Sequence, residues 1–277
     1  MAFHWKDGCF MLYAQNGRLT IGGSTMDYIR FGTGQQTLVM IPGVGDGFQT
    51  VRGTALPFAL MYRRLARDYT VYAFSRRNDL APHTTTREMA MDLYEAMSLL
   101  SLRHASVVGI SQGGMIAQWL AIDRPELVER LVLTVTACRP NSTMRTVIGH
   151  WLELAKQGDY RGILLDSAQR SYSQKRIRSA CFTSELLGRF GRPKGFERFV
   201  IQAESCLSHD AHSELKGISC PTLVIGGTED GIVTGAASEE LAAEIPGAEL
   251  ILYKGLSHAL YEESPDFLER VSQFCKR

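Results

Sequence analysis

The chain lacks an excess of charge of either sign. Its 277 residues carry 30 lysines and arginines against 29 aspartates and glutamates, a net charge of +1. A strong positive excess is typical of proteins that bind nucleic acid or anionic membrane surfaces, so we expect neither partner. The composition is 45% hydrophobic, which at this length suffices for one large α/β domain with an insertion.

Clustered metal ligands and long apolar runs are also missing. No Cys-x-x-Cys pair occurs, and His209 and His212 have no evident third ligand, so we expect no metal, no disulfide framework and no cofactor. No run approaches the roughly 20 apolar residues of a spanning helix, and the first eight residues lack the apolar core of a signal peptide. We therefore predict a cytoplasmic protein. The dispersed cysteines are Cys9, Cys138, Cys181, Cys206, Cys220 and Cys275.

From residue 37 onward, short β-rich runs alternate with segments of helical periodicity. This alternation predicts an α/β fold with a mostly parallel central sheet flanked by helices. A capping-box pattern, Thr85-x-x-Glu88, marks the start of one helix. The predicted strands are 37–41, 69–74, 105–108, 128–135, 221–225 and 249–253, with antiparallel edge strands at 10–13 and within 19–31. Further helices are expected at 56–66, after residue 111 and at 265–275.

The alternation stops between residues 139 and 217. We predict that this helical stretch is a cap inserted above the strand ends, with 1–138 and 218–277 as the core domain. The cap holds 13 lysines and arginines against 8 aspartates and glutamates. A solvated helical surface explains this excess, and an anionic substrate is the alternative. Its apolar residues should divide between packing and lining an acyl pocket: Trp151, Leu152, Leu164, Leu165, Phe182, Leu187 and Phe190.

The most informative motif is Gly109-Ile110-Ser111-Gln112-Gly113, followed directly by Gly114. A Gly-x-Ser-x-Gly sequence between a strand and a helix is typical of a nucleophile elbow, a tight turn that exposes the serine hydroxyl at the sheet edge. The flanking glycines provide the room that such a turn needs. The N-terminus of the following helix favours negative charge at the same place. Ser111 is therefore the predicted nucleophile.

A serine hydroxyl needs a base to take its proton, and that base needs an acid to hold its tautomer. Both residue types follow predicted strands in the expected chain order, with Asp230 after 221–225 and His258 after 249–253. Because the carboxyl ends of parallel strands share one edge of a sheet, these loops can converge on Ser111. We predict His258 as the base and Asp230 as the acid, with Glu229 as the competing acid.

The oxyanion formed by attack on a carbonyl needs two preset hydrogen-bond donors. One should be the backbone N–H of Gln112, directly after the nucleophile. The other should come from the glycine-rich loop 42–47, which follows the first parallel strand and allows close backbone approach. We predict the backbone N–H of Val44 as this second donor.

With these motifs, the chain resembles the α/β-hydrolase superfamily, in its capped bacterial branch of ester, lactone and carbon–carbon bond hydrolases. The resemblance covers nearly the whole chain. It implies Ser111, Asp230 and His258 as the triad, with Val44 and Gln112 as oxyanion donors. The family often carries Asp-x-Arg-Gly where this chain has residues 75–78, Ser-Arg-Arg-Asn. Asparagine tolerates the left-handed backbone conformation, so the resemblance implies that the turn persists.

The leading hypothesis is a serine hydrolase that acts on a small carboxylic ester, thioester or lactone. A carbon–carbon bond hydrolase of a diketone would use the same triad. A ligand receptor or interaction protein on a hydrolase scaffold is a third reading, since a fold does not fix a function. The expected partner is a small ester-like molecule, and both a monomer and a dimer remain open.

Overall fold

The computed structural model describes residues 12–191, 193 and 195–277. Its centre is an eight-stranded sheet in the order β1-β2-β4-β3-β5-β6-β7-β8. The first two strands pair antiparallel, and β2 pairs antiparallel with β4, whereas all other neighbours are parallel. The predicted mostly parallel sheet is thus confirmed. The strands are β1 (Gln15–Ile21), β2 (Ser24–Phe31), β3 (Gln36–Ile41), β4 (Tyr69–Arg77), β5 (Ala105–Ile110), β6 (Val128–Thr134), β7 (Thr222–Gly227) and β8 (Glu249–Tyr253).

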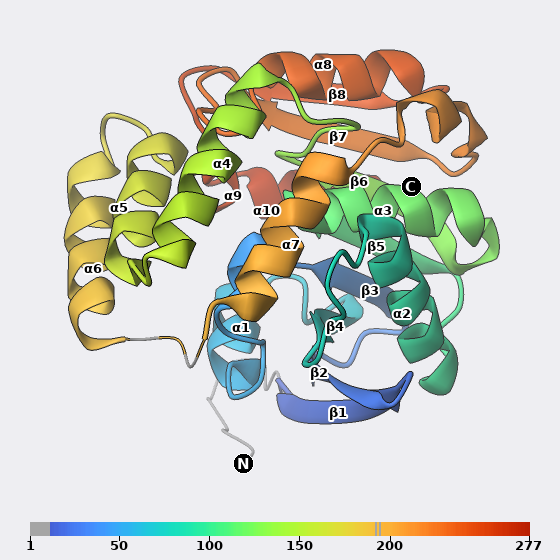
Figure 1. Cartoon of the computed structure of the whole chain (residues 1–277). Coiled ribbons are helices and arrows are strands. Elements are labelled where there is room, and N and C mark those ends of the chain that lie inside the picture. The colour runs from blue at the N-terminus through green and yellow to red at the C-terminus, as the bar shows by residue number, and fades with distance from the viewer. Residues whose placement is uncertain (1–11, 192, 194) are drawn as a thin grey trace, which may run out of the picture.

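Helices cover both faces of the sheet (Figure 1). One apolar core contains buried side chains of α2, α3 and α8, and the other contains those of α1 and α10. Strands β5 and β7 are buried along their whole length, as expected for parallel strands covered on both sides. The helices of this part are α1 (Ala55–Met61), α2 (Thr86–Leu99), α3 (Gln112–Asp123), α8 (Gly235–Glu244), α9 (Leu260–Glu263) and α10 (Phe267–Cys275), with short 3₁₀ turns η1 (Val44–Gly47) and η2 (Pro125–Leu127).

Local sequence signals determine several element boundaries. The side chain of Thr85 accepts a hydrogen bond from the Glu88 backbone N–H, and the Glu88 carboxylate accepts one from the Thr85 N–H, so the predicted capping box is present. The predicted strand at 10–13 lies partly outside the described residues. Leu12 and Tyr13 are not in a strand, so the first edge strand begins later than predicted, at Gln15.

In the described part of the segment predicted as a cap, the helices between β6 and β7 are α4 (Ser142–Lys156), α5 (Tyr160–Ser171), α6 (Ile177–Phe190) and α7 (Glu197–Ser208), followed by η3 (His212–Gly217). In Figure 1, α5 and α6 lie at the outer edge of the molecule, whereas α7 crosses in front of the sheet. Buried residues of α4, α5 and α7 form a third core with Met115 of α3 and with Ile232 and Val233 after β7.

The outer helix α6 has no buried residue. Phe182, Leu187 and Phe190 expose 72%, 54% and 81% of their surface, so the prediction that they pack or line a pocket is wrong. Their apolar side chains suggested burial, but the sequence could not show that the described residues leave these three side chains largely uncovered. Within the described ranges, no helix combines the length and apolar character needed to cross a membrane.

Candidate active site

Ser111 lies on a sharp turn between the end of β5 and the first residue of α3. Its backbone adopts φ 54° and ψ −121°, a conformation that non-glycine residues rarely occupy and that marks stored local strain. The Ser111 N–H donates to the Thr134 carbonyl at 2.9 Å, and the Thr136 hydroxyl donates to the Ser111 carbonyl at 2.7 Å. The last residue of β6 and the loop that follows it therefore hold the strained residue at its N–H and at its carbonyl.

The glycines around Ser111 are required by close backbone contacts. A Cβ on Gly109 would lie 2.5 Å from the Gly113 carbonyl oxygen, and one on Gly113 would lie 2.0 Å from the Ile41 carbonyl oxygen. A Cβ on Gly114 would lie 2.5 Å from the Thr136 side chain. The motif thus reflects the packing of β3, β5 and α3 at the turn rather than chain flexibility.

Asp230 and His258 meet at the same edge of the sheet, on the loops after β7 and β8. The Nδ1 atom of His258 lies 2.9 Å from Oδ2 of Asp230. The other carboxylate oxygen accepts backbone N–H groups of Ile232 at 2.8 Å and Val233 at 3.0 Å. Glu229, the competing acid, is exposed, whereas Asp230 is buried.

The electrostatics of Asp230 favour its charged form. Burial raises the pKa of this carboxyl, but the neighbouring His258 and the two backbone donors outweigh burial, so the pKa is lower than usual. An ionised Asp230 accepts a hydrogen bond and fixes the Nδ1–H tautomer of His258. In this tautomer the Nε2 atom carries the lone pair of the neutral ring and can accept a hydrogen bond.

The glycine-rich loop after β3 approaches the serine closely. A Cβ on Gly43 would lie 3.3 Å from the Ser111 Cβ, so this position has little room for a larger side chain. Val44 begins η1 and Gln112 begins α3, and N–H groups in the first turn of a helix have no intrahelical acceptor. Among the described residues, neither N–H makes a backbone or side-chain hydrogen bond. Both predicted oxyanion donors are therefore available.

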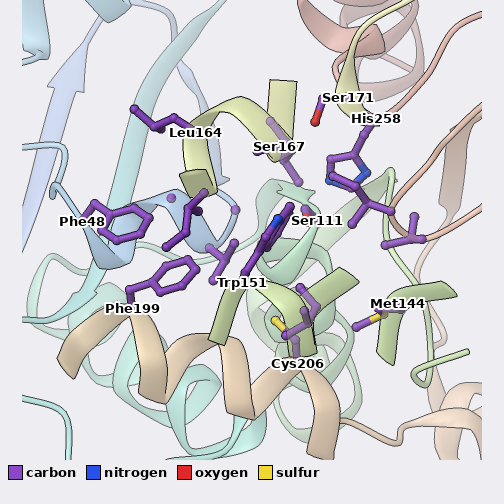
Figure 2. Close-up of a pocket in the computed structure, with 18 of the residues that line it drawn as sticks. Phe48, Ser111, Met144, Trp151, Leu164, Ser167, Ser171, Phe199, Cys206 and His258 are labelled. Carbon is purple, nitrogen blue, oxygen red and sulfur yellow. The ribbon is translucent and has the colours of Figure 1, made fainter. Parts of the chain in front are cut away.

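Ser111, His258 and the loop residues Gly43 to Gly45 share the wall of a cavity of about 210 Å³. In the view of Figure 2, Phe48 and Phe199 lie at one end and His258 at the other, with Ser111 between them. The two phenyl rings stack with centroids 4.1 Å apart. The remaining wall is Ile110, Met115, Met144, Ile148, Trp151, Ile163, Leu164, Ser167, Ser171, Cys206, Ile232, Val233 and Tyr261.

This wall carries no lysine, arginine, aspartate or glutamate among the described residues. The basic residues Arg145 and Arg176 are exposed and lie outside it, so the positive excess of the segment 139–217 does not reach the cavity wall. Of the apolar cap residues expected to line a pocket, Trp151 and Leu164 do so.

Residues 75–78 have contacts that the sequence pattern did not indicate. The Ser75 hydroxyl accepts the Val51 N–H at 2.9 Å, and the Asn78 amide donates to the Thr25 hydroxyl at 2.8 Å. Asn78 is not among the described residues with positive φ, so the left-handed turn expected there is wrong. The neighbouring Arg76 is buried, although sequence reasoning assigned it no role. The position of an arginine shortly after the apolar run 69–74 was the sequence feature that could have indicated a buried charge.

His209 and His212, which the sequence placed three residues apart, lie in different environments. His209 is buried, and its Nδ1 atom lies 2.8 Å from the Thr86 hydroxyl, while its ring contacts Trp119 edge-on. His212 lies near Glu240, at 3.6 Å. Burial lowers the pKa of His209 to about 4, so this ring is neutral at physiological pH. Its arrangement is that of a packed core histidine.

The sheet, the strained serine turn and the Asp–His pair at the strand ends define a hydrolase of the α/β class. The chain belongs to the alpha/beta hydrolase family, whose model matches residues 38–271. It is 25% identical over 280 residues to the uncharacterized hydrolase YugF of Bacillus subtilis, covering 94% of this chain and 97% of that protein. It is 26% identical over 258 residues to a 2-hydroxy-6-oxononadienedioate/2-hydroxy-6-oxononatrienedioate hydrolase of a Pseudomonas species, covering 89% and 90%.

Solved structures agree on the fold. The α/β hydrolase MGS-M2, from a Medee basin deep-sea metagenome library, superposes with a TM-score of 0.85 at 20% identity, covering 94% of this chain and 98% of that one. At this identity the likeness concerns the fold alone. The substrate therefore has to be argued from this chain's own cavity.

Proposed function

We propose that this protein is a serine hydrolase that cleaves a small carboxylic ester, thioester or lactone through an acyl-enzyme on Ser111. One observation carries the proposal: Ser111 and the Asp230-bound His258 open onto a single apolar cavity. Three observations support it further: Ser111 lies on a strained turn, Asp230 holds the Nδ1 side of the His258 ring, and the N–H groups of Val44 and Gln112 make no hydrogen bond within the described part of the chain.

In the proposed reaction, the Ser111 Oγ attacks the substrate carbonyl carbon while His258 Nε2 takes the hydroxyl proton. The carbonyl oxygen becomes an oxyanion, held by the N–H groups of Val44 and Gln112. The imidazolium that forms is stabilised by ionised Asp230 and returns the proton to the leaving oxygen or sulfur as the carbon–leaving-group bond breaks. Water then attacks the acyl-enzyme by the same route, releasing the acid and restoring the Ser111 hydroxyl.

The cavity favours an uncharged, apolar acyl group. Burying a carboxylate without a cationic partner costs several kcal/mol, and this wall offers no lysine or arginine. The same property disfavours the carbon–carbon hydrolase reading, because the substrate in the name of the Pseudomonas relative is a dioate, a dicarboxylate. A neutral ester or lactone therefore fits this wall better than an ester with a carboxylate on its acyl group or a dicarboxylate.

The test begins with a fluorophosphonate probe, which labels a competent serine nucleophile. A receptor with an inert site would leave Ser111 unlabelled. Turnover is then compared between 4-nitrophenyl butyrate and 4-nitrophenyl hemisuccinate, whose acyl groups have the same number of carbons but differ in charge. We expect the neutral ester to have the higher kcat/KM by about 100-fold.

The matched control is Arg145→Ala. Because Arg145 is exposed and lies outside the cavity wall, this variant should keep the wild-type ratio between the two esters. Equal or faster turnover of the hemisuccinate would contradict the assignment of an uncharged substrate, whereas failure of Ser111 labelling would contradict the serine mechanism itself.

A further inference from the structure

Arg76 lies at the end of β4 and exposes only 3% of its surface. Its Nη2 atom donates to the Pro42 carbonyl at 2.5 Å and to the Gln112 side-chain oxygen at 2.8 Å. Pro42 stands two residues before Val44, and Gln112 directly follows Ser111. One guanidinium nitrogen therefore joins the two chain segments that carry the oxyanion donors of the proposed function.

The Gln112 side chain continues this connection to α7. Its amide nitrogen donates to the Gln202 carbonyl at 2.7 Å and to the Ser205 hydroxyl at 3.0 Å. With its oxygen on Arg76 and its nitrogen on α7, the amide is held at both ends. The first residue of α3 is thereby fixed against rotation, and its backbone N–H direction is fixed with it.

The charges around Arg76 do not cancel. Asp46 is the acidic group of the cluster, and it pairs with Arg198 through Oδ2 and Nη2 at 2.5 Å. The same Oδ2 accepts the Arg76 backbone N–H at 3.1 Å, while the Arg76 Nε and Nη1 atoms find no hydrogen-bond partner among the described residues. The Asp46 carboxylate thus forms its ion pair with Arg198, while the Arg76 guanidinium pairs with no carboxylate among the described residues. This leaves one net positive charge buried behind the glycine-rich loop 42–47.

This charge is present at working pH. Burial, together with the neighbouring Arg198, lowers the pKa of Arg76 to about 10 against the opposing attraction of Asp46. A group with this pKa is protonated throughout the range in which ester hydrolysis is measured. Positive charge that is fixed before reaction stabilises negative charge that develops during it, without a reorganisation cost.

We propose that Arg76 is a positioning residue for the oxyanion hole of this hydrolase: it sets the spacing between the Val44 and Gln112 N–H groups and places a buried positive charge behind them. The inference rests on the proposed function. It predicts an effect on the transition state, where the oxyanion exists, and little effect on the ground state, where it does not.

The experiment compares two variants. Arg76→Met keeps much of the side-chain volume without the charge, and Arg76→Lys keeps the charge without the planar guanidinium group. Removal of a direct oxyanion donor costs about 100- to 1,000-fold in kcat. Since Arg76 acts through such donors, we expect Arg76→Met to lower kcat by about 10- to 100-fold with KM within about threefold. Arg76→Lys should recover part of that loss.

A second measurement distinguishes a specific loss of oxyanion binding from a general loosening of the active site. A trifluoromethyl ketone, which forms a tetrahedral oxyanion on the serine, should bind more weakly to Arg76→Met in proportion to the loss of kcat/KM. A non-hydrolysable ether analogue of the ester should bind as it does to the wild type. A variant that is merely loosened would weaken both ligands together, and that outcome would overturn the proposal.

Gln112→Met provides an independent variant should Arg76→Met fail to fold, because it breaks the link and retains the charge. We expect a loss of about tenfold in kcat. The controls are Arg77→Met, whose side chain pairs with Asp92 at 2.8 Å, and Gln118→Met, a buried glutamine of the same helix bonded to the Ala137 carbonyl at 3.1 Å. Both should retain wild-type kcat.

The wild-type protein decides which proposal a negative result affects. If it labels with fluorophosphonate and turns over esters while Gln112→Met and Arg76→Met keep kcat within twofold, the role of Arg76 is wrong and the hydrolase function stands. If the wild type neither labels nor turns over any ester, the proposed function fails and the role of Arg76 fails with it.

Discussion

His209 makes the stability of this protein depend on pH in a calculable way. The residue is 2% exposed, and the Thr86 hydroxyl lies 2.8 Å from its Nδ1 atom while Trp119 donates to the same hydroxyl at 3.2 Å. Burial lowers the pKa of His209 from 6.5 to about 4, against the weaker opposing effect of Asp210. In the unfolded chain the ring regains its ordinary pKa and binds a proton more readily.

Because the folded pKa is the lower one, protonation favours the unfolded state. The contribution to stability is complete above pH 6.5 and is lost as the pH falls toward 4. A difference of 2.5 pKa units corresponds to about 3 kcal/mol in full, of which about 2 kcal/mol is lost by pH 5. This is a large fraction of the free energy of unfolding of an ordinary domain.

The assay is urea unfolding at pH 7.5 and pH 5 for the wild type and His209→Gln. We expect the wild type to lose about 2 kcal/mol more than the variant between the two pH values. The matched control is His150→Gln, which removes an exposed histidine of α4 and should retain the wild-type difference. If wild type and His209→Gln lost the same free energy, the buried neutral ring would not be the source of the pH dependence.

Three further predictions concern the proposed active site. Ser111→Ala should lower kcat by about 10⁶-fold while the circular dichroism spectrum stays unchanged, and retained turnover would refute the nucleophile. His258→Ala should cost as much in kcat, and Asp230→Asn about 10⁴-fold, because the acid only orients and stabilises the imidazole. Glu229→Gln should keep the wild-type kcat, since that side chain is exposed. An inactive Glu229→Gln beside an active Asp230→Asn would identify Glu229 as the acid instead. Trp151→Leu should raise kcat/KM for octanoyl relative to butyryl esters by about tenfold, because the indole forms part of the cavity wall; an unchanged chain-length profile would contradict this.

Most strands of the sheet could be predicted from the sequence, because they are short apolar runs separated by segments of helical periodicity. The predicted runs at 37–41, 105–108 and 249–253 all lie within observed strands. The end of β4 was missed because Arg76 and Arg77 interrupt the apolar pattern, yet both belong to the strand. A charged residue can complete a strand when its partners come from elsewhere in the chain, and those of Arg76 lie 34 and 36 residues away.

The convergence of Ser111, Asp230 and His258 on one sheet edge followed from chain order and the geometry of parallel strands. The character of the cavity did not, because net charge along a segment says nothing about which way its side chains face. The segment 139–217 is basic, but its Arg145 and Arg176 are exposed while its Trp151 and Leu164 line the wall. Only the packing of the helices decides this division.

The contacts of α7 with the core domain determine which helices between β6 and β7 could be exchanged between members of this family. Arg198 donates hydrogen bonds to the backbone carbonyls of Asp46 in η1 and of Arg76 and Arg77 at the end of β4. Helix α7 is therefore bonded directly to the core domain. Helices α5 and α6, by contrast, lie at the outer edge (Figure 1). We expect a chimera in which only residues 142–190 are replaced to change its substrate selectivity and to keep its catalytic residues. A chimera that also replaces α7 would lose the hydrogen bonds of Arg198 unless the core residues that accept them are replaced as well. Substrate selectivity on this scaffold should therefore change most readily through α4, α5 and α6, which contact the substrate cavity or lie outside it without the ties that hold α7.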